Sequence, residues 1–191
     1  MTEKLEERLN QIIPKITSDG FLRGTGIGNE VAFYIFDYPA DEEVRLREYL
    51  DFLSGHLAKK HPDLRVKHVN LFEMVIESLE ARDFLEKSFA KQKSNNGDQA
   101  LLKTLAPLFD GAKLSTAFAE KVNPAETDLI LISGIGSVYP IVRTHNLLSA
   151  LQPKMGHTPL VVFYPGVYDG QYVRLFGKLK GPYYRAFKLV P

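Results

Sequence analysis

Residues 128–140, DLILISGIGSVYP, are the stretch from which the fold of this chain can be worked out. Residues 129–132 form a short apolar run typical of a buried strand. A tight glycine-rich loop follows at 133–137, and residues 138–151 carry apolar side chains at helical spacing. A buried strand followed by a glycine-rich loop and a helix is typical of an α/β protein with a parallel sheet.

Other apolar runs predict further strands around this segment. Residues 31–38, 64–71 and 158–163 are rich in β-branched or aromatic side chains, 184–190 suit an edge strand, and 172–179 are ambiguous. Helical patterns separate the runs, so the fold class is α/β. We expect a mostly parallel central sheet of about four to five strands with helices on both faces.

The middle of the chain, residues 72–122, is helical throughout by its pattern. This stretch is too long for one crossover helix, so it predicts a helical insertion, either a fixed layer or a lid. The whole chain of 191 residues is expected to form a single α/β domain.

Charge is balanced overall but polarised along the chain. The net charge is +1, with −5 on residues 1–138 and +6 on residues 139–191. The absence of cysteine excludes a disulfide framework, a thiolate zinc site and a thiol nucleophile. No apolar run approaches the roughly 18 residues of a membrane span, and the charged N-terminus is unlike a secretory signal. We therefore expect a cytoplasmic protein with no membrane partner.

Loops that follow parallel strands gather at one edge of the sheet, where ligands bind. Here those loops contain Asp37, the segment from Ser133 to Ser137, and residues 164–170. The Ser133–Ser137 loop lacks the lysine of a P-loop and the G-x-S-x-G order of a nucleophile elbow. It is either a tight turn that needs Gly134 and Gly136, or a degenerate loop for an anion or a protein contact.

Catalytic, metal and phosphate signatures are otherwise weak. The glycines at 24–28 precede a strand, which favours a turn over phosphate binding. A triad of Ser133 or Ser137, His145 and Asp37 can be drawn without any geometric support. The histidines at 56, 61 and 68 lack metal-ligand spacing. We predict no catalytic residues, no metal and no cofactor.

The last third of the chain is both aromatic and basic. Tyr168, Arg174 and Lys178 lie among many Phe and Tyr residues in this part of the sequence. Such a composition suits a core, a protein contact rich in Tyr and Arg, or a stacking surface for single-stranded nucleic acid. All three interpretations remain open from the residues alone.

Two long motifs carry a resemblance to a known family. The runs LILISGIGSVYPIVRTHNLLSALQP (129–153) and TPLVVFYPGVYDGQYVRLFGKL (158–179), with YYRAF (183–187) and FDYP (36–39), resemble the BrxB family of bacteriophage-exclusion (BREX) defence systems. The resemblance covers nearly the full length and is loosest over the central helices. The residues that match the motifs are Ser133, Gly134, Gly136, Ser137, Pro140, Arg143, His145, Pro165, Gly166, Tyr168, Gly170, Gln171, Arg174, Phe176 and Gly177.

The resemblance implies a small cytosolic protein with no established enzymatic activity. Its genetic neighbours would be a methyltransferase, a large ATPase and a PglZ-like protein with an alkaline-phosphatase fold. We expect a non-catalytic adaptor that docks the PglZ-like protein and contacts the other subunits. The alternatives are a subunit that binds nucleic acid through its basic C-terminal third, and a degenerate nucleotide-binding or hydrolase-like domain. The candidate contact residues are Ser133, Gly134, Gly136, Ser137, Arg143, His145, Tyr168, Gln171, Arg174, Lys178 and Asp37.

Overall fold

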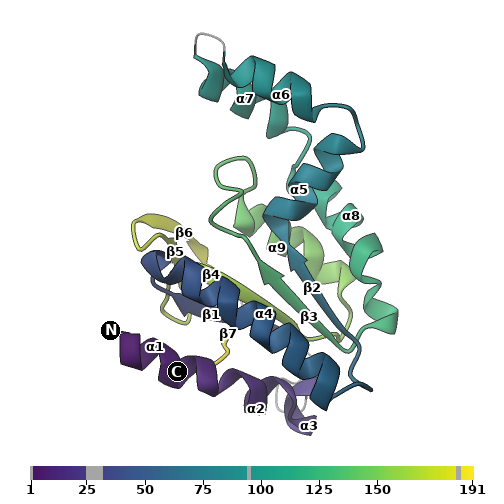
Figure 1. Cartoon of the computed structure of the whole chain (residues 1–191), viewed down its shortest axis with the longest axis vertical. Helices are drawn as coiled ribbons and strands as arrows, with labels where there is room; N and C mark the ends of the chain where they lie inside the picture. Colours follow the sequence, from purple (N-terminus) through teal and green to yellow (C-terminus); the bar gives the residue numbers. More distant parts are fainter. Residues whose placement is uncertain (1, 25–31, 94–95, 184–185) are drawn as a thin grey trace.

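A parallel sheet forms the centre of the molecule (Figure 1). The computed structural model describes residues 2–24, 32–93, 96–183 and 186–191. Within them five strands run parallel in the order β2-β3-β4-β1-β7, which confirms the predicted fold class. The parallel strands are β1 (Phe33–Tyr38), β2 (Val66–Asn70), β3 (Leu129–Ser133), β4 (Leu160–Tyr168) and β7 (Phe187–Lys188).

The central strands are covered on both faces, which explains why their sequences are continuously apolar. Successive side chains of a strand point to opposite faces. Phe33 and Ile35 of β1 accordingly belong to one apolar cluster, whereas Tyr34 and Phe36 belong to the other. The strand pattern of the sequence therefore specified two core layers on one sheet.

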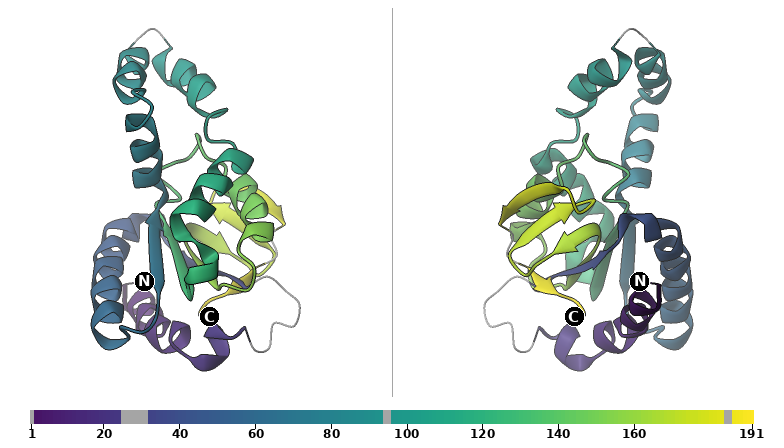
Figure 2. Two further views of the ribbon diagram at one scale, coloured as in Figure 1. Left: turned by 90° about the vertical axis from the view of Figure 1, so that its right-hand side faces the viewer. Right: turned by 90° about the vertical axis from the view of Figure 1, so that its left-hand side faces the viewer.

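Helices form a layer on each face of the sheet (Figure 2). The N-terminal helices and α4 supply Leu5, Ile12 and Leu53 to one cluster, while Phe118 of α8 and Leu147 of α9 belong to the other. The first helical stretch is interrupted at Gln11, so it forms two helices. The layers consist of α1 (Thr2–Asn10), α2 (Ile12–Ile16), α3 (Asp19–Leu22) and α4 (Glu43–Lys60) on one face, and α8 (Gly111–Val122) and α9 (Thr144–Leu151) on the other.

The predicted helical insertion divides into two parts. Helix α8 packs along α9 as part of a layer, whereas α5, α6 and α7 extend away beyond the carboxyl ends of the strands (Figures 1 and 2). We call these three helices the arm. Its helices are α5 (Leu71–Glu80), α6 (Leu85–Gln92) and α7 (Gly97–Leu105).

The loop after β3 is longer than the sequence predicted. Helix α9 begins only at Thr144, and residues 134–142 run through turns. A helix from 138 was therefore wrong at its start, because the backbone of Arg143 is extended (φ −90°, ψ 107°) and separates the turns from α9. We call residues 134–143 the motif loop.

The C-terminal third also contains a hairpin that the sequence left ambiguous. Strand β4 continues past the parallel sheet and pairs with an antiparallel hairpin. The predicted last strand at 184–190 is reduced to β7, and residues 184–185 and 25–31 lie outside the described residues. Across the described ranges, no helix is both long and apolar enough to cross a membrane. The hairpin strands are β5 (Tyr172–Leu175) and β6 (Leu179–Tyr183).

Candidate functional site

The motif loop starts at a partly buried hydrogen bond between β2 and β3. Nε2 of His68 lies 2.8 Å from the Oγ of Ser133, the last residue of β3. Partial burial lowers the pKa of the His68 imidazole, against the opposing effect of the Glu73 and Asp51 carboxylates. Ser133 therefore serves as a hydrogen-bonding group inside the fold.

At Gly134 the space that a side chain would need is occupied by another residue. The φ of Gly134 is +73°, and a Cβ atom there would lie 2.2 Å from the side-chain oxygen of Asn70. That oxygen accepts a hydrogen bond from the backbone N–H of Phe72 and so caps α5. The first glycine of the motif thus joins the loop to the base of the arm.

The two sequence motifs pack against each other at the carboxyl ends of the strands. A Cβ atom on Gly136 would come within 3.0 Å of the Phe176 ring, and the rings of Tyr139 and Phe176 meet edge to face at 6.3 Å. A Cβ on Gly166 would lie 2.1 Å from the carbonyl oxygen of Arg174. Gly136 therefore allows the hairpin turn to lie against the motif loop, and Gly166 allows β5 to lie close to β4.

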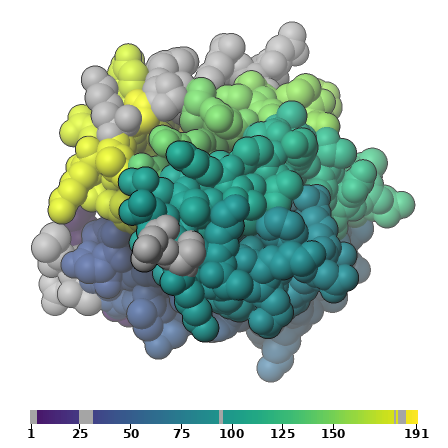
Figure 3. All heavy atoms as spheres, turned by 90° about the horizontal axis from the view of Figure 1, so that it is seen from above, coloured from purple at the N-terminus to yellow at the C-terminus, as the bar shows by residue number. Residues whose placement is uncertain are grey.

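The hairpin presents apolar and basic side chains to solvent. Val167 is 45% exposed and Phe176 39%, and Tyr172 and Arg174 also point outward from β5. The ion pair of Arg174 with Asp169 is long, at 3.6 Å, and exposed. We call Val167, Tyr172, Arg174 and Phe176 the hairpin surface. Figure 3 shows the C-terminal strands in yellow at the rim of the molecule, beside the green segment that precedes β4.

The turn before β5 is fixed by Asp169. Its carboxylate accepts hydrogen bonds from the backbone N–H groups of Gln171 and Tyr172, at 3.0 and 2.7 Å. The hydrogen bonds from Tyr172 and Gln171 are the main reason why the pKa of Asp169 lies below its usual range. Gln171 is exposed at the tip of this turn. Asp169 therefore orients the start of the hairpin surface.

A pocket of about 570 Å³ lies under the hairpin and brings together three predicted residues, Arg143, His145 and Lys178. We call it the basic pocket. Arg143 immediately precedes α9, and its guanidinium lies 5.5 Å from the Tyr139 ring centre. Lys178 belongs to the hairpin turn, about thirty-five positions further along the chain. The other lining residues are Tyr139, Thr144, Asn146, Tyr164, Val173, Leu175, Leu179 and Gly181.

Asp37 and Tyr168 hold the fold together. The Asp37 carboxylate is 2.7 Å from the Arg8 guanidinium and accepts the backbone N–H of Tyr168 at 3.0 Å. The Tyr168 hydroxyl donates to the carbonyl oxygen of Ala186 at 2.6 Å. Both side chains are buried, so neither offers a surface to a partner.

The structure does not assemble a catalytic triad from Ser133, His145 and Asp37. Asp37 is engaged by Arg8, Ser133 lies against His68, and His145 lines the basic pocket. Ser137 is exposed, with its Oγ 3.4 Å from the Arg47 guanidinium. Among the described residues, no group of three His, Cys, Asp or Glu side chains is placed to hold a metal ion.

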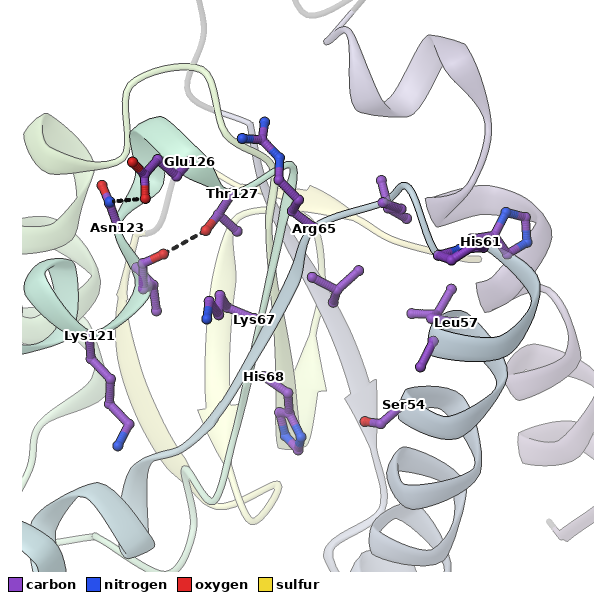
Figure 4. Close-up of a pocket in the computed structure, with 15 residues that line it drawn as sticks. Ser54, Leu57, His61, Arg65, Lys67, His68, Lys121, Asn123, Glu126 and Thr127 are labelled. Atoms are coloured by element: carbon purple, nitrogen blue, oxygen red, sulfur yellow. Dashed lines mark hydrogen bonds between the residues drawn. The ribbon is translucent and has the colours of Figure 1, made fainter.

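A groove along the edge strand β2 was not predicted from the sequence. This groove, of about 700 Å³, lies between α4 and the end of α8 (Figure 4). Ser54 and His61 line one side, Lys121 lines the other, and Lys67 and His68 of β2 lie between them. Of the three clustered histidines at 56, 61 and 68, His61 and His68 line this groove, and His56 lies on α4 outside it.

A second unpredicted cavity separates the arm from the motif loop. It measures about 280 Å³ and is mainly apolar, with Phe72, Ile76 and Phe89 of the arm facing Val138 and Ile141. Phe89 is more than half exposed. The motif loop therefore lies between an apolar cavity under the arm and the basic pocket under the hairpin.

The fold and the geometry of these sites together define the class of protein. The chain is a parallel α/β protein in which the motif loop, the hairpin surface and the basic pocket gather beyond the carboxyl ends of the strands, the edge where α/β proteins commonly bind ligands. The family BREX protein BrxB matches residues 67–189. This chain belongs to the BrxB family, and thereby to BREX phage defence.

Two curated relatives extend the match to nearly the full length. The chain is 42% identical to BREX protein BrxB of Escherichia coli O9:H4 (strain HS), over 98% of this chain and 92% of that protein. It is 35% identical to BREX protein BrxB of Bacillus cereus (strain H3081.97), over 98% of each chain. No solved structure matches the chain significantly.

Proposed function

We propose that this protein is a non-catalytic adaptor subunit of a BREX phage-defence system, and that it docks the PglZ-like subunit. The observation that carries the proposal is the hairpin surface, where Val167, Tyr172 and Phe176 are exposed beside Arg174. Val167 pairs with Arg174 across β4 and β5, and Tyr172 lies on the same face of β5 as Arg174. Exposed apolar side chains that lie together in this way mark protein contacts.

The composition of this surface suits a binding hot spot. Tyr and Arg are enriched among the residues that contribute most to the affinity of protein interfaces. The surface is also firmly supported, because Phe176 packs on the motif loop and Asp169 fixes the turn before Tyr172. A preorganised surface loses less conformational entropy when a partner binds.

The test is co-expression with the PglZ-like protein of the same system, followed by size-exclusion chromatography with light scattering. A stable complex is expected. Tyr172→Ala combined with Arg174→Glu should weaken its affinity at least tenfold, since truncation of one hot-spot residue costs ~2 kcal/mol or more. The matched control is Phe52→Ala with Lys59→Glu, which changes an exposed ring and an exposed base on α4.

Two results would contradict the proposal. If the two proteins elute separately, the PglZ-like protein is not the partner. If the hairpin and α4 variants bind equally well, the hairpin surface is not the contact. In either case the acid-poor C-terminal third favours a second candidate, nucleic-acid binding, for which affinity should fall steeply as salt rises.

A further inference from the structure

The basic pocket is distinguished by the charge of its described lining residues. Its described lining residues include Arg143, His145 and Lys178 but no carboxylate. The sequence strengthens this observation, since residues 129–191 contain one acidic residue, Asp169, which does not line the pocket. A concave site with cationic groups and no carboxylate attracts anions, because its walls concentrate the positive potential.

The cationic groups come from two separate elements. Arg143 stands at the start of α9, over the ring of Tyr139, and Lys178 belongs to the hairpin turn. Within the described part of the chain, no ion pair joins either side chain to a carboxylate. Thr144 and Asn146, in the first turn of α9, add polar groups, and no side chain caps this helix. An anion in the pocket therefore meets donors from both walls.

The remaining walls suit an apolar, planar group. Val173 and Leu175 are buried, and Tyr164 contributes an aromatic ring. Burial raises the pKa of Tyr164 to about 12, so its hydroxyl stays protonated and can donate a hydrogen bond at physiological pH. The volume of about 570 Å³ lies within the range of small-molecule sites.

We propose that the basic pocket binds a nucleoside monophosphate. The phosphate contacts Arg143, Lys178 and the first turn of α9, and the base lies against Tyr164 and the aliphatic wall. The same chemistry is offered by a free nucleotide and by the 5′-terminal nucleotide of a DNA strand. The proposal does not rest on docking of the PglZ-like protein, because the pocket residues are distinct from the hairpin surface.

The test is isothermal titration calorimetry of the full chain with three probes: adenosine 5′-monophosphate, inorganic phosphate and a 5′-phosphorylated single-stranded oligonucleotide. Adenosine monophosphate should bind, and Arg143→Ala with Lys178→Ala should weaken it at least tenfold. The control variant Lys59→Ala with Lys60→Ala removes two charges from α4, on the opposite layer, and should bind normally. Lys178→Ala alone changes only an exposed turn and should weaken binding even if the double variant folds poorly.

The outcomes separate the alternatives. Tighter binding of the oligonucleotide, lost in the same variants, supports the site and identifies a DNA end as the source of the nucleotide. No binding of adenosine monophosphate, or equal binding by the pocket and control variants, overturns the proposal. Inorganic phosphate that binds as tightly as the nucleotide also overturns it, because the aromatic and aliphatic walls would then contribute nothing.

Discussion

At the scale of single residues, Gly134 couples the motif loop to the arm. An alanine there adopts the left-handed region, which costs about 1–2 kcal/mol, and its Cβ displaces the Asn70 cap of α5, which costs about 1 kcal/mol more. Gly134→Ala should therefore lower the free energy of unfolding by about 2–3 kcal/mol, measured by urea denaturation.

Gly156 provides the control for this prediction. Its φ is +57°, but nothing lies within 4 Å of an added Cβ, so Gly156→Ala should cost only the backbone strain. Asn70→Ala should cost about 1 kcal/mol, and combining it with Gly134→Ala should be less than additive. Additive effects would show that the glycine and the cap act independently.

At the scale of elements, His68 of the edge strand β2 is hydrogen-bonded to Ser133 of β3. The partial burial of His68 makes the stability of the protein depend on pH. Because burial lowers the pKa of folded His68, the unfolded chain binds this proton first as the pH falls below about 6.5. The free energy of unfolding should then decline only slightly toward acid, because the His68 ring keeps part of its surface in solvent.

His68→Gln removes the side chain that takes up this proton and keeps a hydrogen-bonding side chain near Ser133. The variant should show a shallower loss of stability between about pH 6.5 and pH 5 than the parent chain. Urea denaturation across that range measures the difference, and pH 8 serves as the reference, where histidine titration does not contribute. Parallel curves for the two proteins would contradict the assignment.

At the scale of the whole molecule, Asp37 connects distant parts of the chain. Its side chain is 10% exposed and pairs with Arg8, which is 14% exposed, so α1, β1 and the end of β4 meet at one carboxylate. Asp37→Ala should lower the free energy of unfolding by about 3 kcal/mol, because it leaves the nearly buried Arg8 guanidinium with two backbone carbonyl acceptors but no carboxylate.

Asp41→Ala, at an exposed position nearby, should change stability by less than about 0.5 kcal/mol in the same denaturation experiment. If Asp37→Ala were as stable as this control, the carboxylate would not hold the fold together. Loss of defence in Asp37→Ala with unchanged stability would instead favour a chemical role for this residue.

Much of the candidate site was predictable, but its arrangement was not. Arg143, His145 and Lys178 were candidates because of their residue types and motif positions, and Asp37 because it ends a strand. The sequence does not show that Asp37 turns toward Arg8, 29 positions earlier, whereas Arg143 and Lys178 line one pocket. Side chains far apart in the chain meet only through packing, which has no local signal.

By itself, the sequence determined the α/β class, the parallel core strands and the presence of most of the helices, because hydrophobic periodicity and β-branched runs are local properties. It also determined the charge polarity and the family motifs. Only the tertiary structure decided that the hairpin folds against the motif loop, that α5–α7 project as an arm, and that a basic pocket forms between motifs. These features depend on long-range contacts, whose free energy comes from burial and complementary shape between segments.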